Sequence, residues 1–87
     1  MSRKHHYLKT ETEYFQAIEE EEKKFELRKD DRDFKMYDYV YFQEVVSGAY
    51  TGRELGPFEI NYILHSKDAG KYGLAEGHCI FNWVSLG

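Results

Sequence analysis

The sequence predicts a small α+β fold that is mainly β, a partly closed barrel of about five strands with one helix against an opening. One stretch in the N-terminal half has apolar residues at helical spacing, and several later stretches alternate apolar and polar residues as strands do. The 87 residues contain no long linker and no repeat, so we expect a single domain over residues 1–87.

A short strand is expected first, over residues 5–9, with Tyr7 on one face and with His6 and Leu8 on the other. Because His5 and His6 would point to opposite faces, we expect no metal site there. We expect no metal or cofactor elsewhere, since no His and Cys cluster has ligand spacing.

The helix is expected over residues 11–21. Thr10 and Glu13 have the spacing of a capping box, and acids in the first turn suit the positive end of the helix dipole. Its apolar stripe consists of Tyr14, Phe15, Ala17 and Ile18. The acids from Glu19 to Glu22 would form its exposed last turn.

Four strands are expected after the helix, over residues 24–29, 39–46, 53–64 and 78–84. Pro57 lies inside the third of them, which predicts a sheet edge or a bulge because proline has no amide hydrogen to donate. Alternation assigns to one face of that strand Phe58, Ile60, Tyr62 and Leu64. Residues 47–52 and 65–73 are predicted to form a hairpin loop and a longer polar loop.

The densest mixture of charged and apolar residues lies in the run 23–34. Phe25 and Leu27 would share one face of the strand, and the opposite face would carry a charged row of Lys24, Glu26 and Arg28. Such a row beside the polar loop 29–33 indicates a place for chemistry or for a polar ligand. The commoner meaning is a solvated face with cross-strand ion pairs, each contributing about 0.2–1 kcal/mol.

Charge and composition limit the classes of function. The net charge of −4 disfavours nonspecific nucleic-acid binding, yet basic residues cluster between residues 23 and 35. No apolar run is long enough to cross a membrane, and the basic start lacks the apolar core of a signal peptide, so we expect a cytoplasmic protein. The single cysteine, Cys79, lies in an apolar run, which predicts a buried, inert thiol.

Several blocks of residues occur in an order that is typical of one known family, namely 6–9, 14–15, 25–29, 31–34, 38, 50–54, 62–64 and 73–77. On these blocks the chain resembles the ASCH domains of the PUA-like superfamily, in particular a branch of small bacterial and phage proteins of unknown function. Lys23, Glu26 and Arg28 match the ASCH signature Gly-x-Lys-x-x-Glu-x-Arg. Glu21 stands at the glycine of this signature, and Tyr37 stands where the branch usually has a glycine just before the residue that matches Asp38. A left-handed residue at the helix exit would now cost energy.

The resemblance implies a PUA-like barrel whose signature residues line a cleft between the barrel and the helix. It implies an RNA- or nucleotide-binding module in which aromatic side chains stack on an unpaired base of single-stranded RNA or of a nucleoside. The residues expected to meet the ligand are Lys23, Glu26, Arg28, Lys29, Arg32 and Arg53.

Two alternatives remain open. One group of ASCH proteins is similar to amidohydrolases that act on a modified nucleoside such as acylated cytidine, through a lysine and a hydroxyl residue. Glu26 occupies the hydroxyl position here, so it would serve as a general base, with Lys23 and Arg28 stabilising an oxyanion. The other alternative is a regulator that binds a protein partner through the acidic residues 19–22.

Overall fold

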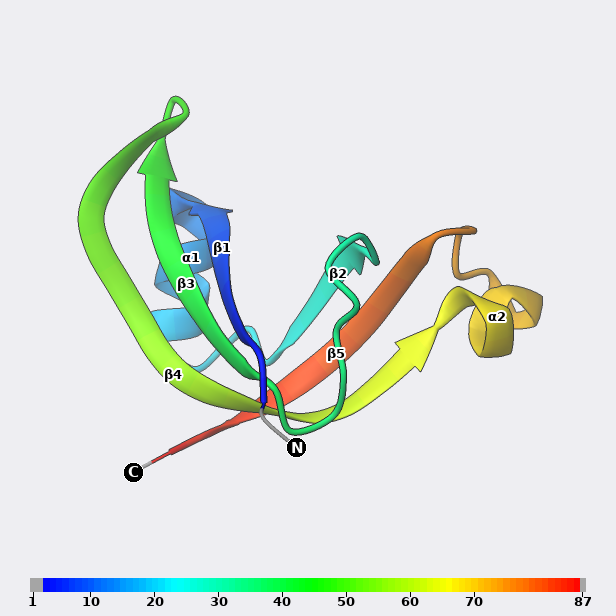
Figure 1. Cartoon of the computed structure of the whole chain (residues 1–87). Helices are drawn as coiled ribbons and strands as arrows, with labels where there is room; N and C mark the ends of the chain where they lie inside the picture. Colours follow the sequence, from blue (N-terminus) through cyan, green and yellow to red (C-terminus); the bar gives the residue numbers. More distant parts are fainter. Residues whose placement is uncertain (1–2, 87) are drawn as a thin grey trace.

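Five strands form one mixed sheet in the computed structural model, which describes residues 3–86 (Figure 1). The elements are β1 (His5–Glu11), α1 (Thr12–Glu19), β2 (Phe25–Lys29), β3 (Tyr39–Val46), β4 (Ala49–His65), α2 (Ser66–Ala69), the 3-10 turn η1 (Gly70–Tyr72) and β5 (His78–Ser85). The strand order is β1-β3-β4-β5-β2, with β1 parallel to β3 and every other pair antiparallel. The expectation of a mainly β α+β fold is confirmed.

The 17-residue strand β4 gives the sheet its curled shape. Its first part pairs with β3 and its last part pairs with β5, and Phe58 has neighbours in both. Figure 1 shows β4 bending from the half of the sheet that holds β1 and β3 to the half that holds β5 and β2. The two halves therefore face each other across the interior, as in a partly open barrel.

The barrel is not closed by strand pairing, because β1 and β2 are the two edges of the sheet. Two arginine side chains span the gap instead. Arg28 donates through Nη2 to the main-chain oxygen of Lys9 at 2.7 Å, and Arg32 donates through Nη1 to that of Tyr7 at 2.6 Å. We call this side-chain connection between β1 and both β2 and the segment after it the arginine seam.

Large aromatic side chains fill the interior, where four phenylalanines are almost fully buried: Phe15, Phe34, Phe42 and Phe81. Helix α1 contributes Phe15 and Ile18 to this core. Cys79 is also fully buried, as expected, and burial raises the pKa of its thiol to about 11. A thiol that stays protonated at neutral pH is a packing residue rather than a nucleophile.

A buried histidine–carboxylate pair ties β1 to the segment before β3. His6 Nε2 lies 2.8 Å from Asp38 Oδ2, and both side chains are less than a tenth exposed. The main-chain N–H groups of Lys4 and Lys35 also donate to this carboxylate, each at 3.1 Å. The buried carboxylate thus satisfies three donors that would otherwise lose their partners.

The start of α1 differs from the capping box that the sequence predicts. Thr10 belongs to β1, and its hydroxyl donates to a main-chain oxygen two residues earlier. The strand continues to Glu11 because its pairing with β3 continues that far. The hydroxyl of Thr12 instead donates to the carboxylate of Glu44 in β3 at 2.6 Å, and the helix ends at Glu19, two residues earlier than expected.

Bulges in β4 correct the predicted arrangement of its side chains. The pairing with β5 shifts between Ile60 and Tyr62, so Ile60 faces the core while Tyr62 and Leu64 face solvent. The prediction that these residues share one face is therefore wrong. The pairing of β4 with β3 also shifts its register, between Leu55 and Phe58 of β4. Pro57 lies within this irregularity, so the predicted bulge at Pro57 is confirmed.

Two segments expected to be loops contain regular structure. Strand β4 already begins at Ala49, so the hairpin turn is shorter than the predicted loop over 47–52. The predicted loop over 65–73 contains α2 and η1. Helix α2 has four residues and buries only Ala69. Such a short helix is too short to show apolar residues at helical spacing in the sequence.

Candidate functional site

Strand β2 has the reverse of the usual polarity. Phe25 and Leu27 share one face of the strand, and Glu26 and Arg28 share the other, as predicted, but this charged face points inward. Lys24, the third residue of the predicted charged row, precedes the strand and is exposed. Glu26 is only 7% exposed, whereas Phe25 and Leu27 are 53% and 57% exposed. Since burial of a carboxylate costs free energy unless cations and hydrogen bonds compensate it, the inward face requires a built electrostatic environment.

Two cations hold the Glu26 carboxylate. Oε1 accepts a short hydrogen bond from Lys23 Nζ, and Oε2 accepts one from Arg28 Nε at 2.6 Å. The side chains of Lys23 and Arg28 are themselves only 16% and 24% exposed. All three signature residues predicted from the sequence therefore meet in one largely desolvated cluster, which we call the signature triad.

The exit of α1 places Lys23 in this triad. The N–H of Glu22 donates to Ala17 O at 2.8 Å, and the N–H of Glu21 donates to Ile18 O at 3.0 Å. These two bonds form a Schellman motif, which needs a left-handed residue at the position of Glu21. Glu21 has a φ of 61°. The resemblance to ASCH domains predicts a glycine at this position, and glycine adopts a left-handed φ without a steric penalty.

Replacing Glu21 by glycine is expected to raise the free energy of unfolding by about 0.5–1 kcal/mol, because glycine adopts left-handed φ without a steric penalty. Urea denaturation of both proteins measures the change. Glu22→Gly is the matched control, and it should destabilise the protein because residue 22 has no positive φ. An equal loss of stability in both variants would contradict the strain at Glu21.

Aromatic rings surround the Lys23 ammonium. Nζ lies 5.3 Å from the centroid of the Phe25 ring, 5.7 Å from that of Trp83 and 6.0 Å from that of Tyr14. It also donates to the main-chain oxygen of Phe25 at 2.6 Å. These ring faces and this oxygen fix the position of the ammonium group beside Glu26.

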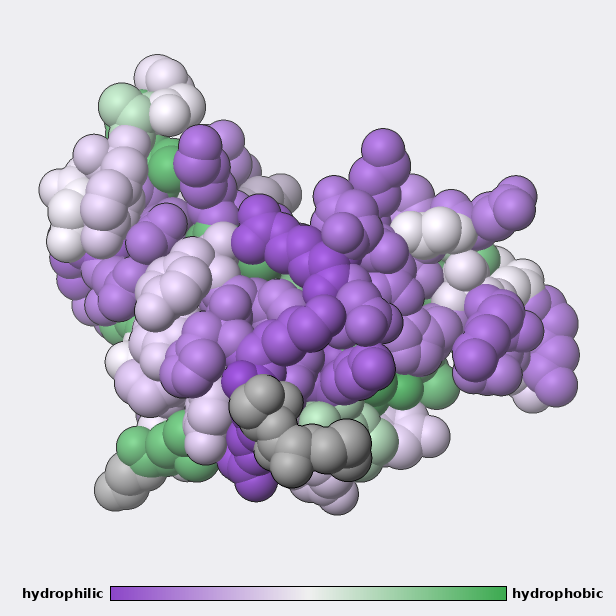
Figure 2. All heavy atoms as spheres, in the orientation of Figure 1, coloured by the Kyte–Doolittle hydropathy of each residue, from purple (hydrophilic) through white to green (hydrophobic). Residues whose placement is uncertain are grey.

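A cleft of about 630 Å³ opens beside the triad, between the edges of β1 and β2. Its lining comprises Lys9, Thr10, Glu11, Tyr14, Lys23, Phe25, Glu26, Leu27, Arg28 and Lys29. The volume lies within the range of about 300–1,000 Å³ that is typical of small-molecule sites. Figure 2 shows hydrophilic residues across the centre of the molecule, from β1 towards β2.

Comparison with known proteins places the chain in a family. The family model described as "Domain of unknown function (DUF3850)" matches residues 5–83. The chain belongs to the DUF3850 family. No curated protein matches it. The DUF3850 match begins with β1 and ends within β5, so it contains all residues of the cleft and of the signature triad.

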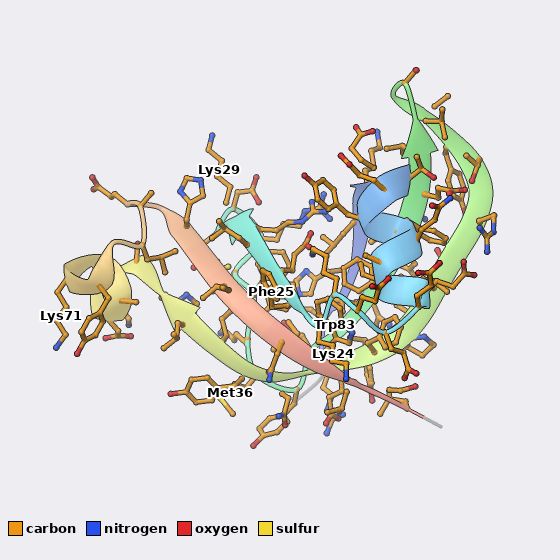
Figure 3. All side chains as sticks on the ribbon, turned by 180° about the vertical axis from the view of Figure 1, so that it is seen from behind. Lys24, Phe25, Lys29, Met36, Lys71 and Trp83 are labelled. Atoms are coloured by element: carbon orange, nitrogen blue, oxygen red, sulfur yellow. The ribbon has the colours of Figure 1, made fainter. Side chains whose placement is uncertain are left out.

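The structure distributes the other predicted site residues of this DUF3850 domain over different places. Lys29 lines the rim of the cleft and projects from the end of β2 in Figure 3. Arg32 belongs to the arginine seam and does not line the cleft. Arg53 lies apart, on β4, where it pairs with Glu19 and stands over the ring of Phe15 at 5.2 Å.

Three cleft residues on or next to β1, and one on α1, were not predicted to belong to the site: Lys9, Thr10, Glu11 and Tyr14. The three residues of β1 reach the cleft because β1 pairs with β3 and thereby becomes the sheet edge that faces β2. No local pattern in the sequence signals that pairing. Tyr14 was expected in the apolar stripe of the helix, but it is half exposed and faces the cleft, whereas Phe15 and Ile18 are buried.

Two further features, metal-binding clusters and membrane-spanning helices, were sought within the part of the chain that the structure describes. Within residues 3–86, no group of three or more His, Cys, Asp and Glu side chains is arranged to hold a metal ion. None of the helices in this range is long and apolar enough to span a membrane.

Proposed function

We propose that the cleft beside the signature triad binds RNA or a nucleotide. The observation that carries the proposal is the inverted β2 strand, which turns its charged face into a cleft instead of into solvent. Four cationic and two acidic side chains line the cleft, although the whole chain has a net charge of −4. A locally basic cleft on an acidic protein favours a specific anionic ligand over nonspecific attraction.

The cleft also offers surfaces for a base. Tyr14 and Phe25 line it and are 50% and 53% exposed, so each ring has a face that can accept a stacked partner. Unpaired bases stack on such rings, while arginine and lysine contact the phosphates. Arg28 and Lys29 at the β2 edge are the cations placed to meet a phosphate.

We further propose that the DUF3850 family is related to the ASCH domains of the PUA-like superfamily. Two structural observations support this relationship. The signature residues form one cluster at the junction of helix and strand. In addition, the two positions where glycine was expected, Glu21 and Tyr37, both have left-handed φ, at 61° and 75°.

Replacing Arg28 by alanine is expected to weaken binding of a short single-stranded RNA by about fivefold, the equivalent of about 1 kcal/mol for one lost phosphate contact. The slope of log affinity against log salt concentration should fall by about 0.7. Fluorescence anisotropy at several salt concentrations measures both quantities, and an NMR titration shows whether the shifts cluster on residues 23–32.

Arg53→Ala is the matched control for this experiment, because Arg53 is an arginine in an exposed ion pair outside the cleft. It should change neither the affinity nor the salt dependence. Arg28 also donates to the main chain of β1, so circular dichroism must first show that the Arg28 variant is folded. Unchanged RNA affinity in a folded Arg28→Ala protein would refute binding at this cleft.

A small amidohydrolase acting on a modified nucleoside is the second candidate. One observation favours it, namely a buried carboxylate in contact with a lysine at the wall of the cleft. Against it stands the fact that both oxygens of Glu26 already accept hydrogen bonds from cations, so each oxygen that would have to take a proton from water is already engaged. Incubation with acylated cytidine separates the candidates, because only an enzyme would release the free nucleoside.

A further inference from the structure

An apolar patch covers the solvent face of β2, β5 and β4. The strand register places Leu27, Ile80 and Leu64 in one row across the three strands. The neighbouring row contains Phe25, Asn82 and Tyr62. We call these two rows the outer patch. A shallow groove of about 220 Å³ lies on it, lined by Phe25, Tyr62, Leu64, Ile80, Phe81 and Asn82.

Two departures from regular sheet patterning create the outer patch. The inverted polarity of β2 exposes Phe25 and Leu27. The bulge after Ile60 in β4 exposes Tyr62 and Leu64, which regular alternation would have placed differently. Sheets that face water usually present polar residues there. Contiguous exposed apolar residues of this kind mark an interaction site.

The outer patch is continuous with the cleft. Phe25 lines both the cleft and the outer groove, so its side chain lies at the boundary between them. Because β2 is an edge strand, an extended ligand can pass over it from one face of the sheet to the other. Lys24 and Lys29 are exposed and lie just before β2 and at its end, where they suit the phosphates of such a ligand (Figure 3).

Asn82 places a polar group in the middle of the outer patch. Its Oδ1 accepts a hydrogen bond from the N–H of Tyr62 at 2.8 Å, which orients the amide and turns its NH₂ group away from that bond. An oriented donor between two exposed rings suits a base, which has ring acceptors at its edge and a face that stacks. If the outer patch were instead buried against another protein, burial of the Asn82 NH₂ group would cost free energy unless that protein offered it a hydrogen-bond acceptor.

We propose that the outer patch is a second subsite, which binds the base of the nucleotide next to the one in the cleft. Phe25 and Tyr62 provide the stacking surface, and the Asn82 amide donates to the edge of the base. This inference rests on the proposed function, since it requires a single-stranded nucleic acid in the cleft. It adds that the protein recognises at least two consecutive nucleotides rather than an isolated one.

The test compares cytidine monophosphate with a single-stranded cytidine tetranucleotide as probes. We expect the tetranucleotide to bind at least tenfold more tightly. Tyr62→Ala should remove about tenfold of that affinity, as the loss of one stacked base does, and should leave the affinity for the mononucleotide within twofold. Tyr62→Phe keeps the ring and should bind like the unaltered protein. Tyr50→Ala is the matched control, because Tyr50 is similarly exposed but lies outside the outer patch.

The outcomes separate this inference from the proposed function. If the mononucleotide binds but neither chain length nor Tyr62→Ala changes the affinity, the second subsite is refuted and the cleft stands. If neither probe binds, both are refuted. If sedimentation shows a dimer that Tyr62→Ala converts into a monomer without any effect on tetranucleotide binding, the outer patch is an interface between two copies and the inference is refuted.

Discussion

Alanine in place of Glu26 is expected to lower the free energy of unfolding by about 3 kcal/mol, the usual loss when one partner of a buried ion pair is removed. The variant leaves the Lys23 ammonium and the Arg28 guanidinium close together without the anion that they share. Neither cation can move fully into water, because less than a quarter of each side chain is exposed. Urea denaturation of the variant and the unaltered protein measures the loss.

Glu26→Gln distinguishes the structural contribution of this residue from its contribution to binding. The amide keeps the shape of the side chain but removes the negative charge from the wall of the cleft. The affinity for RNA should therefore stay the same or rise, while hydrolysis of acylated cytidine, if the protein performs it, should disappear.

A loss of stability below about 1 kcal/mol in Glu26→Ala would show that the triad behaves as an exposed ion pair.

Alanine in place of Asp38 is expected to have an effect of similar size, about 3 kcal/mol, because each buried donor left unsatisfied costs about 1–3 kcal/mol. Asp38 is 5% exposed and accepts from the His6 ring and from two main-chain N–H groups. Its loss would release the first residues of β1 from the segment that precedes β3. The midpoint of thermal or urea denaturation measures the change.

Asp33→Asn is the matched control for Asp38. Asp33 belongs to the same segment, but its carboxylate only faces Lys4 and Lys35 at 3.5 Å across exposed ion pairs. Asparagine also tolerates the left-handed φ of 52° that Asp33 adopts. The expected loss is below about 0.5 kcal/mol. Equal losses in the two variants would show that general charge balance, rather than the buried hydrogen bonds, stabilises this segment.

Local periodicity in the sequence predicted where the strands begin and end better than it predicted which of their faces are buried. The bounds of β3 agree with the prediction at both ends, since a long strand of branched and aromatic residues followed by glycine has few alternatives. The two faces of β2 were also predicted. Which face is buried could not be, because a five-residue strand with apolar residues on one side and charges on the other can be placed either way.

The composition of the cleft depended on information that no local pattern contains. The triad followed from a matched signature, whereas Thr10 entered the cleft through the pairing of β1 with β3. Arg53 was expected among the ligand-binding residues, but it lies on β4 against α1, where it pairs with Glu19 and does not line the cleft. The bulge after Ile60 likewise has no clear residue signal, and it decides which side chains form the outer patch.

The arginine seam explains why the protein has a cleft at all. Direct pairing would bring β1 and β2 to a separation of about 4.8 Å and consume their main-chain groups, leaving no room between them. Instead, the side chains of Arg28 on β2 and of Arg32 in the segment after β2 reach across to the carbonyl groups of Lys9 and Tyr7 on β1. Because Arg28 and Arg32 connect the two edges through side chains, the main-chain groups of β1 and β2 stay unpaired with each other and the space between the edges remains open.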